Sequence, residues 1–179
     1  RPSKSGGAWM SNFVEQSYLL GLKPVIYNVC NFKKPSEGET CLLSWDETTT
    51  LFHEFGHALH GMFASQKYPS LSGTNVPRDF VEMPSQFNEH CAADPVIFAN
   101  FAKHYKTGAA MPAELVKKMR DAEKFNQAYG LVENITACLL DMAWHTLSPE
   151  EAAAVTDINK FQEEALRKAN ALYTAIPPR

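Results

Sequence analysis

The chain has 179 residues, enough for one hydrophobic core, and 45% hydrophobic and 21% charged residues are ordinary for a globular protein. Its net charge of −3 gives no general attraction to nucleic acid or anionic membranes, and no apolar run approaches the roughly 20 residues that span a bilayer. No secretory signal is visible, and the four cysteines form no C-x-x-C pair, so we expect reduced, buried thiols. These features predict a cytoplasmic protein with neither nucleic acid nor membrane as a partner.

The first part of the chain is predicted to form a small antiparallel sheet. Residues 7–16 and 23–32 are rich in β-formers, and a short apolar run predicts a third strand at 40–45. Residues 33–39 contain proline, glycine and charges, which predict a loop. Asp46 follows the third predicted strand and is a candidate N-cap for a helix.

That helix contains His53-Glu54-Phe55-Gly56-His57, an H-E-x-x-H motif. A spacing of four residues places His53 and His57 on one helix face, one turn apart, where two imidazoles can hold one Zn²⁺. Glu54 follows the first histidine directly, so its carboxylate can take a proton from an attacking water and pass it to a leaving amine. The bare pattern also arises by chance on solvated helices.

The context of the motif favours a metal site. Gly56 costs about 1 kcal/mol of helix propensity, which indicates that another element packs close to it. His60 lies ~10 Å along the helix axis from His53, so we leave it out of the ligand set. The helix has a hydrophobic side that predicts packing against a core, formed by Phe52, Phe55, Leu59 and Phe63.

A catalytic zinc site needs a third protein ligand, and residues 79–89 offer Glu82. Residues 68–77 form a predicted loop between this segment and the H-E-x-x-H helix. On a helix, Glu82, Gln86 and Glu89 share one face, which gives one ligand and candidate groups that orient the histidines. From spacing alone, the alternative of an acidic surface helix stays open.

The rest of the chain is predicted to be helical. Its apolar residues recur with a helical period in four ranges, and Ser148-Pro149-Glu150-Glu151 is a further helix start. The predicted fold class is therefore α+β, mainly α, with a small antiparallel sheet next to the zinc-binding helix and a helical bundle after it. The four helical ranges are 92–106, 112–127, 130–147 and 157–173.

Several motifs together resemble the thimet-oligopeptidase family of zinc metallopeptidases, and the resemblance extends from about residue 1 to 179. The motifs of the family are His53-Glu54-Phe55-Gly56-His57, Ser72-Gly73-Thr74-Asn75, Arg78-Asp79-Phe80-Val81-Glu82 and Pro84-Ser85-Gln86. The motifs that most resemble its bacterial peptidyl-dipeptidase branch are Gly6-Gly7-Ala8-Trp9-Met10, Pro24-Val25-Ile26-Tyr27-Asn28-Val29-Cys30-Asn31-Phe32 and Asn88-Glu89-His90.

The resemblance implies a function and a set of roles. His53, His57 and Glu82 would be the ligands of one zinc ion per chain, and Glu54 would be the catalytic general base. The full-length enzyme would hydrolyse oligopeptides by zinc-activated water and release C-terminal dipeptides. Because endopeptidases of the family share the same motifs, an oligoendopeptidase remains the alternative.

The resemblance also implies that the 179 residues are part of a larger catalytic domain. Family members place a His and Tyr set, which holds the oxyanion, in a segment after the matched region, and a helical part before it. We expect 1–46 to form the sheet, 47–92 the metal-site helices and 93–179 the helical part. The expected partners are peptide substrates and the remainder of the parent domain, and the fragment alone would bind zinc with little turnover.

Overall fold

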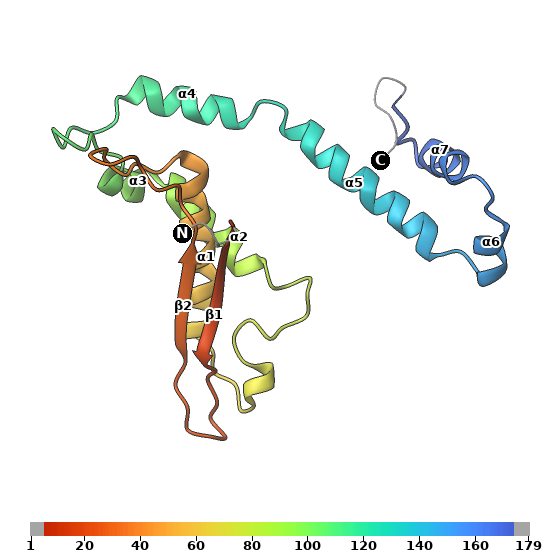
Figure 1. Cartoon of the computed structure of the whole chain (residues 1–179), viewed down its shortest axis with the longest axis horizontal. Coiled ribbons are helices and arrows are strands. Elements are labelled where there is room, and N and C mark those ends of the chain that lie inside the picture. The colour runs from red at the N-terminus through yellow and green to blue at the C-terminus, as the bar shows by residue number, and fades with distance from the viewer. Residues whose placement is uncertain (1–5, 174–179) are drawn as a thin grey trace. The chain divides into compact units, whose positions relative to one another are not determined.

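The structure is a computed structural model that describes residues 6–173. Contacts divide the chain into two compact units, Arg1–Met111 and Pro112–Arg179, and each is described by itself. The described residues are mainly helical, with one small antiparallel sheet in the first unit (Figure 1), which confirms the predicted fold class. The single catalytic domain with its three predicted parts stays a prediction.

The sheet consists of two strands, β1 (Ala8–Val14) and β2 (Val25–Cys30). They pair antiparallel from Ala8 opposite Cys30 to Val14 opposite Val25, with an irregularity between Asn12 and Val14. The two strands predicted at 7–16 and 23–32 are therefore confirmed, with shorter bounds.

The third strand predicted at 40–45 is wrong. Residues 40–44 have no regular secondary structure, and the sheet within residues 6–173 has two strands. Leu42 is 63% exposed, so the apolar run that indicated a strand does not lie in a core. An apolar run becomes a strand only when a partner edge lies beside it, and nothing local to the run provides that edge.

Helix α1 (Trp45–Met62) carries the H-E-x-x-H motif and begins earlier than predicted. Its N-cap is Ser44 and not Asp46: Ser44 Oγ accepts a hydrogen bond from Glu47 N–H, and the Glu47 carboxylate accepts one from Ser44 N–H. This reciprocal capping box satisfies two backbone donors that a cap at Asp46 would leave unpaired. The Ser44-x-x-Glu47 spacing was visible in the sequence.

Helix α1 packs against both strands on one side and against α2 (Met83–Ala93) on another (Figure 1). A Cβ on Gly61 would lie 2.2 Å from Ile26 Cδ1 and 2.6 Å from Met10 Cε, so the helix rests closely on the side chains of the sheet. This contact holds the motif-bearing helix in a fixed position.

The loop predicted at 68–77 is confirmed, and it contains a single 3-10 turn, η1 (Pro69–Leu71). The loop is attached to the segment that follows β1, because the buried Ser72 Oγ donates to Gln16 Oε1 at 3.0 Å. Asn75 Nδ2 donates to Glu15 Oε1 at 3.0 Å in the same region. The connection between α1 and α2 is therefore held by side-chain hydrogen bonds.

The single helix predicted at 92–106 is also wrong. Helix α2 ends at Ala93, and a separate short helix, α3 (Pro95–Phe101), begins after Asp94. The Asp94 carboxylate accepts from the N–H groups of Val96 and Ile97, and Pro95 lacks the N–H that would continue the preceding helix. A cap followed by proline therefore divides the range.

The second unit consists of helices α4 (Ala113–Glu123), α5 (Gln127–His145), α6 (Pro149–Ala154) and α7 (Ile158–Lys168). Its buried core is formed by Leu140, Leu166 and Ala171. The helix start predicted at Ser148 is confirmed, since Ser148 and Glu151 form a capping box. The helices predicted at 112–127 and 157–173 are confirmed with shorter bounds as α4 and α7. The helix predicted at 130–147 is confirmed as α5, which begins earlier than predicted, at Gln127, and ends at His145.

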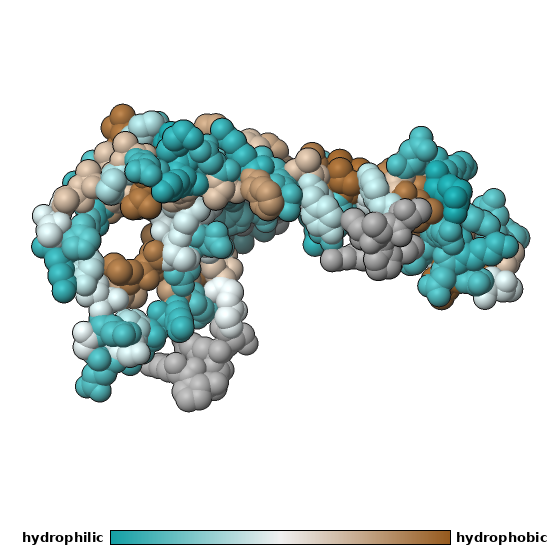
Figure 2. Space-filling model, turned by 90° about the horizontal axis from the view of Figure 1, so that it is seen from above, coloured by the Kyte–Doolittle hydropathy of each residue, from teal (hydrophilic) through white to brown (hydrophobic). Residues whose placement is uncertain are grey.

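Apolar and sulfur-containing side chains are more exposed than the sequence indicated. All four cysteines are free, as predicted, but the prediction that they are buried is wrong: Cys41 and Cys138 are exposed, and Cys30 and Cys91 are partly exposed. Hydrophobic residues lie on the surface of both units (Figure 2), and Phe63 and Phe125 are 78% and 79% exposed. Exposed apolar surface is typical of regions that contact other protein. Among residues 6–173, no helix combines the length and apolarity required to cross a membrane.

Candidate metal centre

One part of the centre lies on a single face of α1. His53 and His57 are one turn apart, and their rings are close, with centroids 4.9 Å apart and planes at 84°. His57 is buried at 8% exposure, and the His53 side chain is 24% exposed. The helical spacing in the sequence therefore brings the two imidazoles together as predicted.

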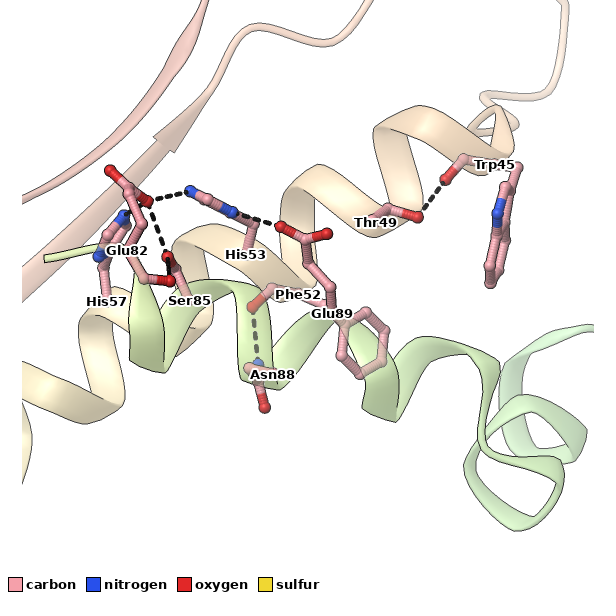
Figure 3. Close-up of polar contacts among 9 residues, drawn as sticks. All are labelled: Trp45, Thr49, Phe52, His53, His57, Glu82, Ser85, Asn88 and Glu89. Atoms are coloured by element: carbon pink, nitrogen blue, oxygen red, sulfur yellow. Dashed lines mark hydrogen bonds and ion pairs between the residues drawn. The ribbon is translucent and has the colours of Figure 1, made fainter. Parts of the chain in front are cut away.

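Glu82 reaches the same point from the other helix. It occupies the N-cap position of α2, directly before Met83, and its carboxylate points back toward α1 (Figure 3). Glu82 Oε2 lies 3.1 Å from His53 Nε2 and 3.2 Å from His57 Nε2. A single carboxylate oxygen is thus close to both Nε2 atoms, and the loop between the two helices makes this approach possible.

The three side chains fit a divalent metal ion. One ligand atom from each of His53, His57 and Glu82 lies within 4.8 Å of the other two, and within the described residues this is the group of metal-ligand side chains that meets that condition. A tetrahedral zinc with nitrogen and oxygen ligands at 2.0–2.2 Å separates them by roughly 3.3–3.6 Å. The observed separations from Glu82 are close to that range, and two imidazoles with one carboxylate are a ligand set typical of catalytic zinc.

Ser85 fixes the carboxylate of Glu82. Ser85 is fully buried, and its Oγ lies 2.8 Å from Glu82 Oε2, to which it donates, and 2.9 Å from the Glu82 carbonyl oxygen. The hydrogen bond from Ser85, followed by the nearby imidazoles of His57 and His53, lowers the pKa of the Glu82 carboxyl below its usual value. The carboxylate is therefore held in the charged form that a metal ligand requires.

Glu89 contacts the opposite side of the His53 ring. Its Oε1 lies 2.6 Å from His53 Nδ1, so the ring lies between two carboxylates, that of the N-cap residue Glu82 at Nε2 and that of Glu89 at Nδ1 (Figure 3). The predicted shared face of Glu82 and Glu89 brings both to the histidines. Gln86 is different, because no hydrogen bond joins it to either histidine within residues 6–173.

Glu54 directly follows His53 in α1 but is not one of the clustered groups. It is 6% exposed, and its Oε2 has no hydrogen-bond partner among the described residues. Asn28 Nδ2 on β2 donates to the Glu54 carbonyl oxygen at 2.6 Å, which fixes the backbone at this position. A buried carboxylate oxygen without a protein partner is suited to a bound water or substrate group.

Close approach of the two helices places these groups together. A Cβ on Gly56 would lie 2.6 Å from Ser85 Cα and 2.8 Å from the Pro84 carbonyl oxygen. The expectation that another element packs against Gly56 is therefore confirmed. Asn88 Nδ2 also donates to the Phe52 carbonyl oxygen at 2.6 Å, which links the helices next to His53.

We expect Gly56→Ala to lower the melting temperature and weaken metal binding. The added methyl group would meet backbone atoms of α2, and overpacking of this kind costs typically 1–3 kcal/mol, more than the roughly 1 kcal/mol that alanine gains in helix propensity. Thermal unfolding followed by circular dichroism measures the change. Gly130→Ala is the matched control: nothing lies within 4 Å of its added Cβ, so stability should rise or stay level. Equal stability of Gly56→Ala and the parent would contradict the close contact.

The sequence did not indicate every residue that supports the centre. Ser85, Asn28 and Asn88 lie within motifs that carry the family resemblance, yet their hydrogen bonds to Glu82 and to α1 depend on the tertiary fold. His60 lies outside the cluster of His53, His57 and Glu82, and its ring centroid is 6.0 Å from that of Phe80. Burial, followed by nearby His57, lowers the pKa of the His60 imidazole.

The fold and this centre agree with the result of sequence comparison. Residues 1–178 match the model of Peptidase family M3, and the chain belongs to that family.

Individual relatives have peptidase names. The chain is 60% identical over 179 residues to Dipeptidyl carboxypeptidase of Escherichia coli K12, and 55% identical to the protein of that name from Salmonella typhimurium LT2. It is 38% identical over 182 residues to Oligopeptidase A of Escherichia coli K12. These alignments cover 100%, 100% and 99% of this chain, and the chain spans 26% of the length of each relative.

Proposed function

We propose that the full-length protein is a zinc-dependent metallopeptidase that hydrolyses oligopeptides and releases dipeptides from their C-termini. The observation that carries the proposal is the meeting of His53, His57 and Glu82 at one point, beside the buried Glu54. Membership of Peptidase family M3 supports the reaction class, and the identity to two dipeptidyl carboxypeptidases supports the mode of cleavage. A cytoplasmic location stays a prediction.

The residues have distinct roles in this proposal. His53 and His57 bind through Nε2 and Glu82 through Oε2, the atoms that face one another in the structure. Bound zinc supplies Lewis-acid chemistry, which polarises the peptide carbonyl and makes water a stronger nucleophile at neutral pH.

Glu54 is the proposed general base. Its carboxylate accepts the proton of the attacking water while the new C–O bond forms, and then delivers that proton to the nitrogen of the leaving amine as the peptide C–N bond breaks. Burial keeps bulk water from competing for the Oε2 atom, which has no partner within the described residues.

An oligoendopeptidase is the second candidate, because the chain is also 38% identical to an Oligopeptidase A. Digestion of an unblocked decapeptide by the full-length protein, followed by mass spectrometry, separates the two. Successive losses of two residues from the C-terminus support dipeptide release, and internal cuts without such losses support the endopeptidase. In either case we expect a zinc chelator to stop cleavage.

For residues 1–179 alone, we propose zinc binding without appreciable turnover. They span 26% of the length of the relatives, and peptide hydrolysis also requires groups that stabilise an oxyanion. Loss of one such donor costs ~10²–10³ in rate. Cleavage of the same decapeptide by residues 1–179 at a rate close to that of the full-length protein would contradict this proposal.

A further inference from the structure

The imidazole of His53 has a carboxylate at each of its two nitrogens, one from the N-cap of α2 and one from within α2. Nε2 lies 3.1 Å from Glu82 Oε2, and Nδ1 lies 2.6 Å from Glu89 Oε1. Glu82 and Glu89 are separated by two turns of helical register, which places them at opposite edges of the ring (Figure 3). Glu89 is only one-third exposed, with a side-chain value of 33%.

We propose that Glu89 is a positioning residue that orients His53 for metal binding, an inference that rests on the proposed zinc site. An ionised carboxylate only accepts hydrogen bonds, so Nδ1 of a neutral His53 must carry the hydrogen. The lone pair is then on Nε2, the nitrogen that faces Glu82 and His57. Glu89 thereby selects both the tautomer and the angle of the ring, and its charge makes the imidazole a stronger ligand.

The structure holds Glu89 in register for this role. Asn88, the preceding residue, donates to the carbonyl oxygen of Phe52, the residue before His53. The neighbouring contacts Asn88–Phe52 and Glu89–His53 therefore fix the position of this part of α2 relative to α1. Glu89 is not itself in a position to be a third ligand, because it contacts Nδ1, on the far side of the ring from Glu82.

The two histidines are supported differently. His57 Nδ1 is buried and has no hydrogen-bond partner among residues 6–173, whereas His53 Nδ1 has the close contact with Glu89. We therefore expect removal of Glu89 to act on the metal through His53 alone.

The test compares zinc affinity in the full-length protein by competition with a chromogenic chelator. Loss of a carboxylate that orients a metal-bound histidine weakens affinity typically 10–100-fold, and we expect this for Glu89→Ala. Glu89→Gln should show a smaller loss, since its amide oxygen still accepts from Nδ1–H without the charge. Glu123→Gln removes the same charge at an exposed position of the second unit and should leave the zinc affinity unchanged.

Two further measurements distinguish a positioning role of Glu89 from a purely structural one. The melting temperature of each metal-free protein shows whether Glu89→Ala folds, and affinity is compared at a temperature where all variants are folded. The visible absorption spectrum of the cobalt-substituted protein should change in Glu89→Ala, because the ring angle at the metal changes. Wild-type affinity and an unchanged cobalt spectrum in Glu89→Ala would overturn this inference alone. Failure of the parent protein to bind zinc would overturn the proposed metal centre as well.

Discussion

Replacing Glu54 with glutamine in the full-length protein lowers kcat by a factor of roughly 10²–10⁴ or more while zinc stays bound. The amide has nearly the same shape but cannot accept a proton from water, so the general-base contribution is lost. Glu54 is 6% exposed and lies outside the cluster of ligand atoms, so the change should not release the metal. Steady-state kinetics with a fluorogenic peptide, together with zinc analysis of the same samples, measures both quantities.

Glu37→Gln is the matched control for this prediction. Glu37 is exposed in the loop between β2 and α1, so the same loss of charge should leave both kcat and zinc content at parent values. Near-normal turnover in Glu54→Gln would show that Glu54 is not the base. Loss of zinc together with turnover would show instead that Glu54 contributes to metal binding.

Replacing His53 with alanine removes zinc and activity together. The change deletes one of the three proposed ligand side chains and leaves the carboxylates of Glu82 and Glu89 without their shared partner. We expect zinc content to fall from about one ion per chain to near zero, with peptide cleavage at background. Metal analysis after dialysis measures the first, and the decapeptide digest measures the second.

His145→Ala is the corresponding control. His145 is at the end of α5 with a side chain that is 73% exposed, and it lies in the other unit. Its removal should leave zinc content and cleavage unchanged. Retention of one zinc by His53→Ala with normal cleavage would contradict the assignment of this residue.

The local part of the centre could be predicted from the sequence, and the long-range part could not. Histidines four apart on a helix must share a face, so the pairing of His53 with His57 followed from spacing alone. The approach of Glu82 to these histidines depends on how closely α1 and α2 pack, and that distance is set by the contact of Gly56 with Ser85. Spacing left Glu82 open for that reason, and the family resemblance was needed to single it out.

The errors in the predicted fold have two causes: dependence on distant parts of the chain, and local capping signals that were given too little weight. The strand predicted at 40–45 was wrong because strand formation depends on a partner that the apolar run does not reveal. The helix start at Ser44 and the break at Asp94 were readable, since a capping box and an Asp-Pro pair are local signals. Both were outweighed by apolar patterns that extended beyond the true ends of the elements.

The central claim is that one zinc ion is held by His53, His57 and Glu82. Anomalous diffraction at the zinc edge from crystals of the full-length protein tests it most directly, since it locates the metal independently of the protein atoms. We predict one strong peak per chain, at 2.0–2.2 Å from His53 Nε2, His57 Nε2 and Glu82 Oε2. A peak ligated by Glu54 or Glu89 in place of Glu82, or no peak between α1 and α2 in zinc-loaded crystals, would contradict the claim.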